Sequence, residues 1–153
     1  MESVAPFDPL AAHRYFSAAC FNKTWAMMDK KERSSADNEQ MLLLALASLW
    51  HWTQRPDCKQ RNLAVGQYLL SRVYSTLGDA GNASLHAAKC LMLSEGEEPF
   101  YIGSAHEAAA RAALLGGNDE AAASHMAEAR RLAVLVTDAE DRAQLEEDLN
   151  SIL

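Results

Sequence analysis

Apolar residues recur every three to four positions through most of the chain, which is the period of an α-helix. The clearest example lies at residues 63–77, where Leu63, Leu70, Val73 and Leu77 share one helical face. No segment alternates apolar and polar residues convincingly over the length of a strand. Alanine is abundant and β-branched residues are scarce, a balance that favours helix. The pattern therefore predicts an all-α chain.

Proline, glycine and capping residues divide this pattern into about seven helices. Asp8-Pro9 opens the first helix, Arg55-Pro56 breaks the chain after the second, and Gly78 ends the third. Loops of only a few residues force consecutive helices to pack antiparallel. We expect a single domain over residues 1–153, built from three helical hairpins and a C-terminal capping helix. Their expected bounds are 8–54, 58–94, 99–136 and 138–153.

The second of these helices is apolar nearly all round. Its segment 41–47 reads Met-Leu-Leu-Leu-Ala-Leu-Ala, and Leu-Trp-His-Trp follows at 49–52. A helix of this kind is normally surrounded by others, so we expect it in the middle of the domain. Trp50 and Trp52 are two positions apart and cannot share a helical face. One of them should pack in the core, and the other should lie nearer a surface or groove.

The third and fourth helices align with the fifth and sixth when the sequence is shifted by 39 residues, which places Gly78-Asp79 over Gly117-Asn118. This repeat resembles the tetratricopeptide repeat, whose 34-residue signature is W-x₂-L-G-x₂-Y, then A-x₃-F, then P. The first copy supplies Leu70, Tyr74 and Ala83 at signature positions. The signature tryptophan and glycine are missing from both copies, and the period is five residues longer.

The resemblance implies a right-handed stack of hairpins, with the first helix of each hairpin lining a concave groove. Equivalent positions would then form ladders along that groove, with Tyr68 and Arg72 beside Glu107 and Arg111. Two arginines in register would offer forked donors to a carboxylate-bearing peptide. Trp52 completes this candidate groove. The alternative is that Glu107 and Arg111 form a weak ion pair on a solvated helix.

Charge and cysteine content restrict the partners and the compartment. The net charge is −7, and residues 96–153 carry four basic and twelve acidic groups, which argues against nucleic acid or anionic membrane as a partner. The most apolar stretch, residues 41–50, is about half as long as a membrane-spanning helix. The first residues lack the pattern of a secretory signal. Three cysteines without CxxC spacing suggest no disulfide framework, so we expect a cytoplasmic protein.

The sequence predicts no catalytic residue, cofactor or metal site. His106-Glu107 begins the zinc-protease pattern H-E-x-x-H, but Ala110 stands where the second histidine is required. His86 and Cys90 are four positions apart and could share a helical face. Neither a phosphate-binding glycine loop nor a nucleophile elbow is present. Enzyme activity is therefore not predicted, although a site assembled from distant residues stays open.

We interpret the chain as a non-enzymatic interaction or scaffold module that binds a peptide segment, or another copy of itself, through its groove. One alternative is a helical enzyme or metal-binding protein using His51, His86, His106 or His125. Another is an obligate homodimer with a structural role. The whole chain also resembles small bacterial proteins of this architecture that have no assigned function, which implies no mechanism.

Overall fold

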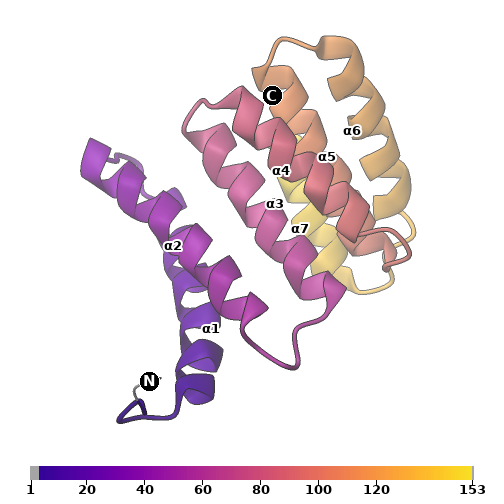
Figure 1. Ribbon diagram of the computed structural model, residues 1–153. Coiled ribbons are helices and arrows are strands. Elements are labelled where there is room, and N and C mark those ends of the chain that lie inside the picture. The colour runs from indigo at the N-terminus through magenta and orange to yellow at the C-terminus, as the bar shows by residue number, and fades with distance from the viewer. Residues whose placement is uncertain (1–3, 153) are drawn as a thin grey trace. The chain divides into compact units, whose positions relative to one another are not determined.

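The computed structural model describes residues 4–152, and this part of the chain forms seven α-helices and no strand (Figure 1). The prediction of an all-α chain with seven helices is confirmed. The helices are α1 Pro9–Met28, α2 Ser35–Thr53, α3 Gln60–Thr76, α4 Ala80–Leu93, α5 Pro99–Leu115, α6 Asp119–Ala133 and α7 Ala139–Asn150. None of these described helices is long and apolar enough to cross a bilayer.

Side-chain caps fix where most helices begin. Asp8 accepts a hydrogen bond from the backbone nitrogen of Leu10 at 2.9 Å, and Pro9 takes the first helical position. Ser34 and Asp37 form a capping box at α2, in which each side chain accepts from the other's backbone N–H. These contacts satisfy donors that the first helical turn cannot pair. Local sequence therefore marks where these helices begin.

The 39-residue repeat is visible in the helix bounds. Helices α3 and α5 begin 39 residues apart, and so do α4 and α6. Each hairpin turns on a glycine in the left-handed region, Gly78 and Gly117, both at φ +78°. The next residue, Asp79 or Asn118, donates its N–H back to the preceding helix at 2.9 Å and caps the following one. The two hairpins thus share one turn geometry.

The chain divides into two compact units, residues 1–59 and 60–153; the expected single domain stays a prediction. The first unit is the antiparallel hairpin of α1 and α2. Ser48 donates to the backbone oxygen of Ser17 at 2.7 Å across the hairpin, and Thr24 donates to that of Cys20 at 2.7 Å. The buried side chains described in its helices are Ser17, Cys20, Thr24, Met41, Ala45 and Ser48. Half of this small core is polar.

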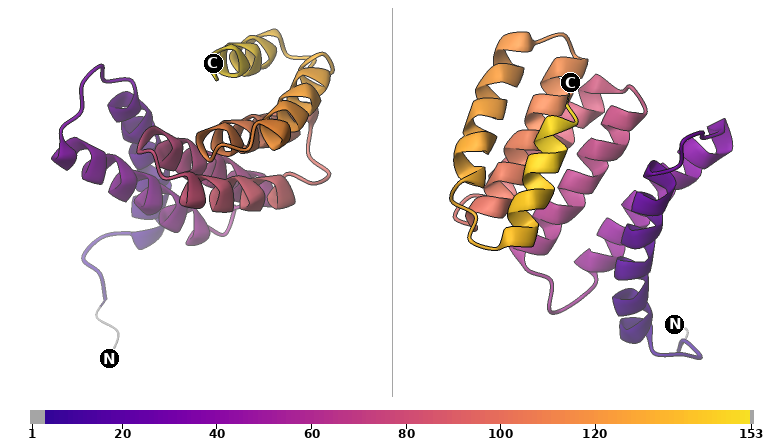
Figure 2. Two further views of the ribbon diagram at one scale, coloured as in Figure 1. Left: turned by 90° about the horizontal axis from the view of Figure 1, so that it is seen from above. Right: turned by 180° about the vertical axis from the view of Figure 1, so that it is seen from behind.

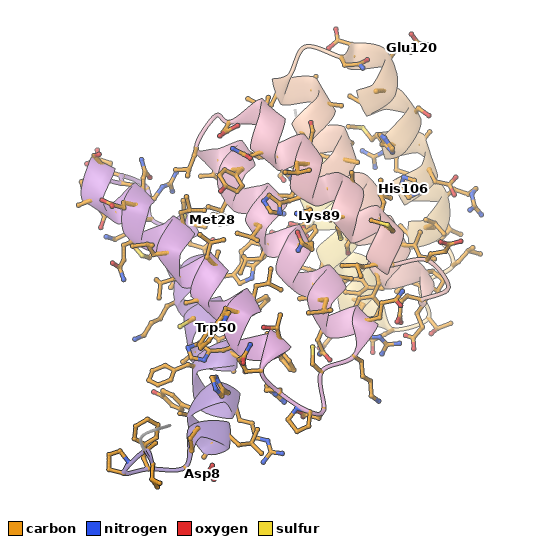
Figure 3. The ribbon with its side chains drawn as sticks, viewed as in Figure 1. Asp8, Met28, Trp50, Lys89, His106 and Glu120 are labelled. Atoms are coloured by element: carbon orange, nitrogen blue, oxygen red, sulfur yellow. The ribbon has the colours of Figure 1, made fainter. Side chains whose placement is uncertain are left out.

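Helix α2 buries only one of its faces. Met41, Ala45 and Ser48 are buried, whereas Leu43 and Trp50 are each 54% exposed. Within the first unit, α1 covers a single stripe of α2, so this hairpin alone does not surround α2 on all sides. Trp50 is the exposed tryptophan of the pair (labelled in Figure 3), and Trp52 is partly buried.

The second unit consists of two antiparallel hairpins, α3–α4 and α5–α6, followed by α7. Alanines fill much of its core, and their small side chains let the helices approach closely. Helix α7 packs on α5 and α6 and lies in front of the layer that contains α3 and α5 (Figure 2, right). Its apolar stripe, Leu145, Leu149 and Ile152, is buried in one cluster with Val136. This stripe is thus the packing face of the last helix.

Candidate functional site

The structure brings together the four residues that the repeat register places on α3 and α5. We call Tyr68, Arg72, Glu107 and Arg111 the α3–α5 ladder. Nη1 of Arg72 donates to the hydroxyl of Tyr68 at 2.7 Å and lies 3.8 Å from Oε2 of Glu107. Nε of Arg111 donates to Oε1 of Glu107 at 2.8 Å. The ladder is therefore one connected polar cluster spanning both hairpins.

Helix α7 covers this ladder, so the ladder does not line an open groove. Arg72 Nη1 lies 3.3 Å from Oδ1 of Asp148, and Arg111 Nη2 donates to the backbone oxygen of Asp148 at 3.0 Å. Arg111 Nη2 also donates to the hydroxyl of Ser151 at 2.9 Å. Sequence reasoning missed Asp148 and Ser151. The sequence did offer a signal for Asp148. It is an acidic residue directly before Leu149, at the edge of the apolar stripe, and the repeat provides two arginines at equivalent positions that could pair with it.

Glu107 is the most unusual member of the cluster, because its side chain is completely buried. Arg111 pairs with Oε1, but Oε2 has no hydrogen-bond partner among the described residues. A buried carboxylate is costly unless it is paired and hydrogen-bonded on both oxygens. The interpretation of Glu107 and Arg111 as a pair on a solvated helix is therefore wrong. The pair stabilises an interior position and depends on its surroundings.

The charges of the cluster balance only when α7 is in place. The ladder alone contributes two guanidinium groups and one carboxylate, and Asp148 adds the second carboxylate. Burial raises the pKa of the Tyr68 phenol, with Glu107 acting in the same direction, so Tyr68 stays a neutral hydrogen-bonding group. Without α7, the ladder on α3 and α5 therefore has a net charge of +1. A helix with one acidic side chain at this place neutralises it.

Gly103 shapes the seat on which α7 lies. A Cβ atom added to Gly103 would lie 2.7 Å from Cδ2 of Leu145, closer than two such atoms can approach. The equivalent position in the first hairpin is Ala64, a residue with a side chain. The missing side chain on α5 therefore gives Leu145 the room that brings α7 close enough for its polar contacts.

The histidines form polar pairs within the hairpins. His106 on α5 (Figure 3) and His125 on α6 approach to 3.0 Å between their Nδ1 atoms. At the equivalent place in the first hairpin, Nδ1 of His86 lies 2.6 Å from Oε1 of Gln67. Burial lowers the pKa of both His86 and His106, which favours neutral rings. These pairs therefore act as satisfied polar contacts between helices.

The described residues contain no group of three or more histidine, cysteine, aspartate or glutamate side chains arranged to hold a metal ion. His51 approaches His13 instead, with 2.8 Å between their Nδ1 atoms. The Cys90 thiol donates to the backbone oxygen of Ala64 at 3.3 Å, and His86 contacts Gln67 instead. Burial raises the pKa of the Cys90 thiol to about 12, so it stays protonated. The spacing of His86 and Cys90 thus does not create a ligand pair.

Trp52 belongs to α2 in the first unit, whereas the ladder belongs to the second. The guanidinium carbon of Arg55 lies 3.7 Å from the centre of the Trp52 ring, a cation–π contact. Arg55 also pairs with Asp57 at 2.7 Å and holds the pKa of that carboxyl at about 2. These contacts give Trp52 a local packing partner.

Comparisons with family models, curated proteins and solved structures found no match to this chain. The resemblance to tetratricopeptide repeats therefore stays a prediction from the 39-residue register.

Proposed function

We propose that this chain is a non-enzymatic protein–protein interaction module whose α3–α5 ladder binds an acidic amphipathic helix of a partner protein. Helix α7 is then the resident helix, which a partner displaces. The concave groove implied by the repeat is retained in this proposal, but the chain's own last helix fills it.

The observation that carries the proposal is the contact of Asp148 with two arginines from different hairpins. Arg72 meets its carboxylate and Arg111 meets its backbone oxygen. The guanidinium group of arginine has N–H donors in a fixed planar fork, so it is more selective for the position and orientation of an acidic group than the ammonium group of lysine is. Leu145 and Leu149 of α7, and Ile152 just after it, occupy the adjoining cluster. A partner would need apolar residues at the same spacing, with an acid directly before the second one.

Two features favour exchange of the resident helix. The Arg72 guanidinium is nearer to Asp148 than to Glu107, and Oε2 of Glu107 has no hydrogen bond from the described residues while α7 is seated. Departure of Asp148 would let Arg72 turn to Glu107, which offsets part of the cost of opening. The chain between α6 and α7 spans residues 134–138, in which Val134 and Leu135 are exposed and Val136 is buried. The two exposed residues directly after α6 are at the end of an element, where hinges are found.

The test uses the full chain and a fluorescently labelled peptide covering residues 138–152. A tethered helix competes at an effective concentration of about millimolar, so the wild-type chain should bind the peptide weakly. Leu145→Glu with Leu149→Glu should unseat α7 and tighten peptide binding at least about tenfold. A peptide carrying Asp148→Asn should bind the opened chain about tenfold more weakly, because a charge-assisted contact is lost.

Glu146→Gln with Glu147→Gln is the matched control, because these side chains are exposed on the outer side of α7. It should leave peptide binding unchanged. Asp148→Asn in the full chain is a gentler opening variant that keeps the apolar stripe, and circular dichroism checks that the other helices persist. Failure of both opened chains to bind the wild-type peptide more tightly than the unmodified chain does would overturn the proposal.

A further inference from the structure

Helix α2, in the first unit, carries a buried stripe on one face and an exposed apolar stripe on the opposite face, and neither includes a residue of the α3–α5 ladder. At 3.6 residues per turn, the buried residues Met41, Ala45 and Ser48 share one side of the helix. Leu43, Leu46 and Trp50 then fall on the opposite side, and all three are exposed. We call these three residues the outer seam.

The outer seam has the spacing of a helix–helix interface. Its members are separated by three and then four positions, which is the spacing of the core positions in a coiled coil. The same intervals occur on the buried stripe, which packs against α1. A helix with one buried stripe would ordinarily carry polar residues on its other face. From Met41 to Thr53, α2 has no charged residue.

Aromatic rings extend the outer seam onto α1. Trp50 meets the ring of His51 at a centroid distance of 4.9 Å, and His51 stacks on Phe16 at 5.5 Å. Phe16 in turn meets Tyr15 at 5.1 Å. Tyr15 is 66% exposed and Phe16 is 44% exposed. The two helices thus present one continuous apolar patch.

We propose that this patch is the interface between two copies of the chain, which pair through the outer seams of their α2 helices. Its five large side chains expose on the order of 500 Å², taking about 150–250 Å² for a whole aromatic residue. That area is at the upper end of the largest patch on a typical monomer, and it approaches the ~800 Å² that each partner contributes to a stable interface. The hairpin's own core is small and half polar, so burial of the patch supplies stability that it lacks.

A second copy fits the chemistry of the patch better than a charged peptide does. None of the five patch residues is charged, and α2 has no charged residue from Met41 to Thr53. Such a surface offers a charged partner no complementary group within the patch. Two copies related by a twofold axis place identical surfaces together, and an apolar seam is complementary to itself. The ladder in the second unit is suited to an acidic side chain, whereas this patch is suited to the same patch on a second copy of the chain.

The experiment is light scattering of the full chain across a dilution series from about 100 µM to about 1 µM. The wild-type chain should be dimeric at the upper end. Leu43→Glu with Leu46→Glu should raise the dissociation constant at least about a hundredfold and leave a monomer, because two carboxylates would be buried without partners. Met92→Glu is the matched control, since Met92 is an exposed apolar residue on α4. It should leave the dimer intact.

A disulfide cross-link tests directly whether the outer seams of two copies lie against each other. In a Cys58→Ser background the remaining cysteines, Cys20 and Cys90, are buried. Leu46→Cys in that background should oxidise to a disulfide-linked dimer, and Met92→Cys should not. Circular dichroism and binding of the residue 138–152 peptide should be the same in the monomeric and dimeric chains. Failure of the ladder and failure of the seam are therefore separate outcomes.

Two results would overturn the inference. One is a wild-type chain that stays monomeric at about 100 µM. The other is a dimer that survives Leu43→Glu with Leu46→Glu, which would place the interface elsewhere.

Discussion

Nη2 of Arg111 donates to the backbone oxygen of Asp148 at 3.0 Å, so α5 holds α7 with the same guanidinium that neutralises its own Glu107. One side chain therefore couples an interior ion pair to the seating of the last helix. Loss of Arg111 should affect both at once.

Arg111→Met should destabilise the chain by about 3–5 kcal/mol, because it leaves the carboxylate of Glu107 buried without its main partner. Urea unfolding followed by circular dichroism measures the loss. Glu107→Gln with Arg111→Met should recover a large part of it, since the buried charge is then removed too. A double variant no more stable than Arg111→Met alone would show that the cost does not come from the unpaired carboxylate.

Gly103→Ala should destabilise the chain by about 1–3 kcal/mol, although alanine is the better helix former. The new Cβ would lie 2.7 Å from Cδ2 of Leu145, a buried atom with little room to move. Gly81→Ala is the matched control in α4, where the nearest atom would be 3.7 Å away. It should be neutral or stabilising by up to about 1 kcal/mol. In the Gly103→Ala background, Leu145→Ala should cost less than it does in the wild type.

Gly117→Ala should cost about 1 kcal/mol, because its φ of +78° is unfavourable for a residue with a side chain. Its neighbour Gly116 has a φ of −81° and ordinary contact distances for an added Cβ. Gly116→Ala should therefore be close to neutral. Thermal unfolding of the two variants side by side tests whether the turn requires glycine at only one of these positions.

Acidification should destabilise the chain between about pH 7.5 and pH 5.5. Burial is the main cause that lowers the pKa of His51, His86 and His106 in the folded chain. The unfolded chain therefore binds more protons as the pH falls through about 6.5, so stability is complete above that pH and declines below it. Aspartates with lowered pKa, such as Asp57, act at lower pH. The urea midpoint at the two pH values measures the effect.

His106→Gln isolates one contributor to that pH dependence. Gln67 already occupies the equivalent place in the first hairpin and accepts the contact with His86. The variant should keep a hydrogen bond to His125 and make the decline with acidity shallower. A slope identical to that of the wild type would assign the effect to other groups.

The fold was largely predictable because its determinants are local. Caps such as Asp8 and Ser34 and the turn glycine Gly78 act within a few residues, and the structure places helix ends beside them. The ladder was predictable as well, since the 39-residue register of the sequence is enough to align Arg72 with Arg111.

The position of α7 was not predictable in the same way. Its amphipathic pattern indicates a packed helix but does not say which face receives it. That choice depends on the room left by Gly103 and on the charge balance around Glu107, both of which arise from distant segments. Likewise, the composition of α2 indicates burial on all sides but does not name what covers each side.

The charge carried by α7 has a consequence for how fast the proposed acidic partner would arrive. Residues 138–150 contain six acidic groups and one basic group, a net charge of −5. While seated, this helix surrounds the arginines with a field that repels an acidic partner from a distance, although those arginines attract it at contact. Salt with a Debye length of about 10 Å would screen the repulsion. Added salt should therefore speed the first encounter, the reverse of ordinary electrostatic steering.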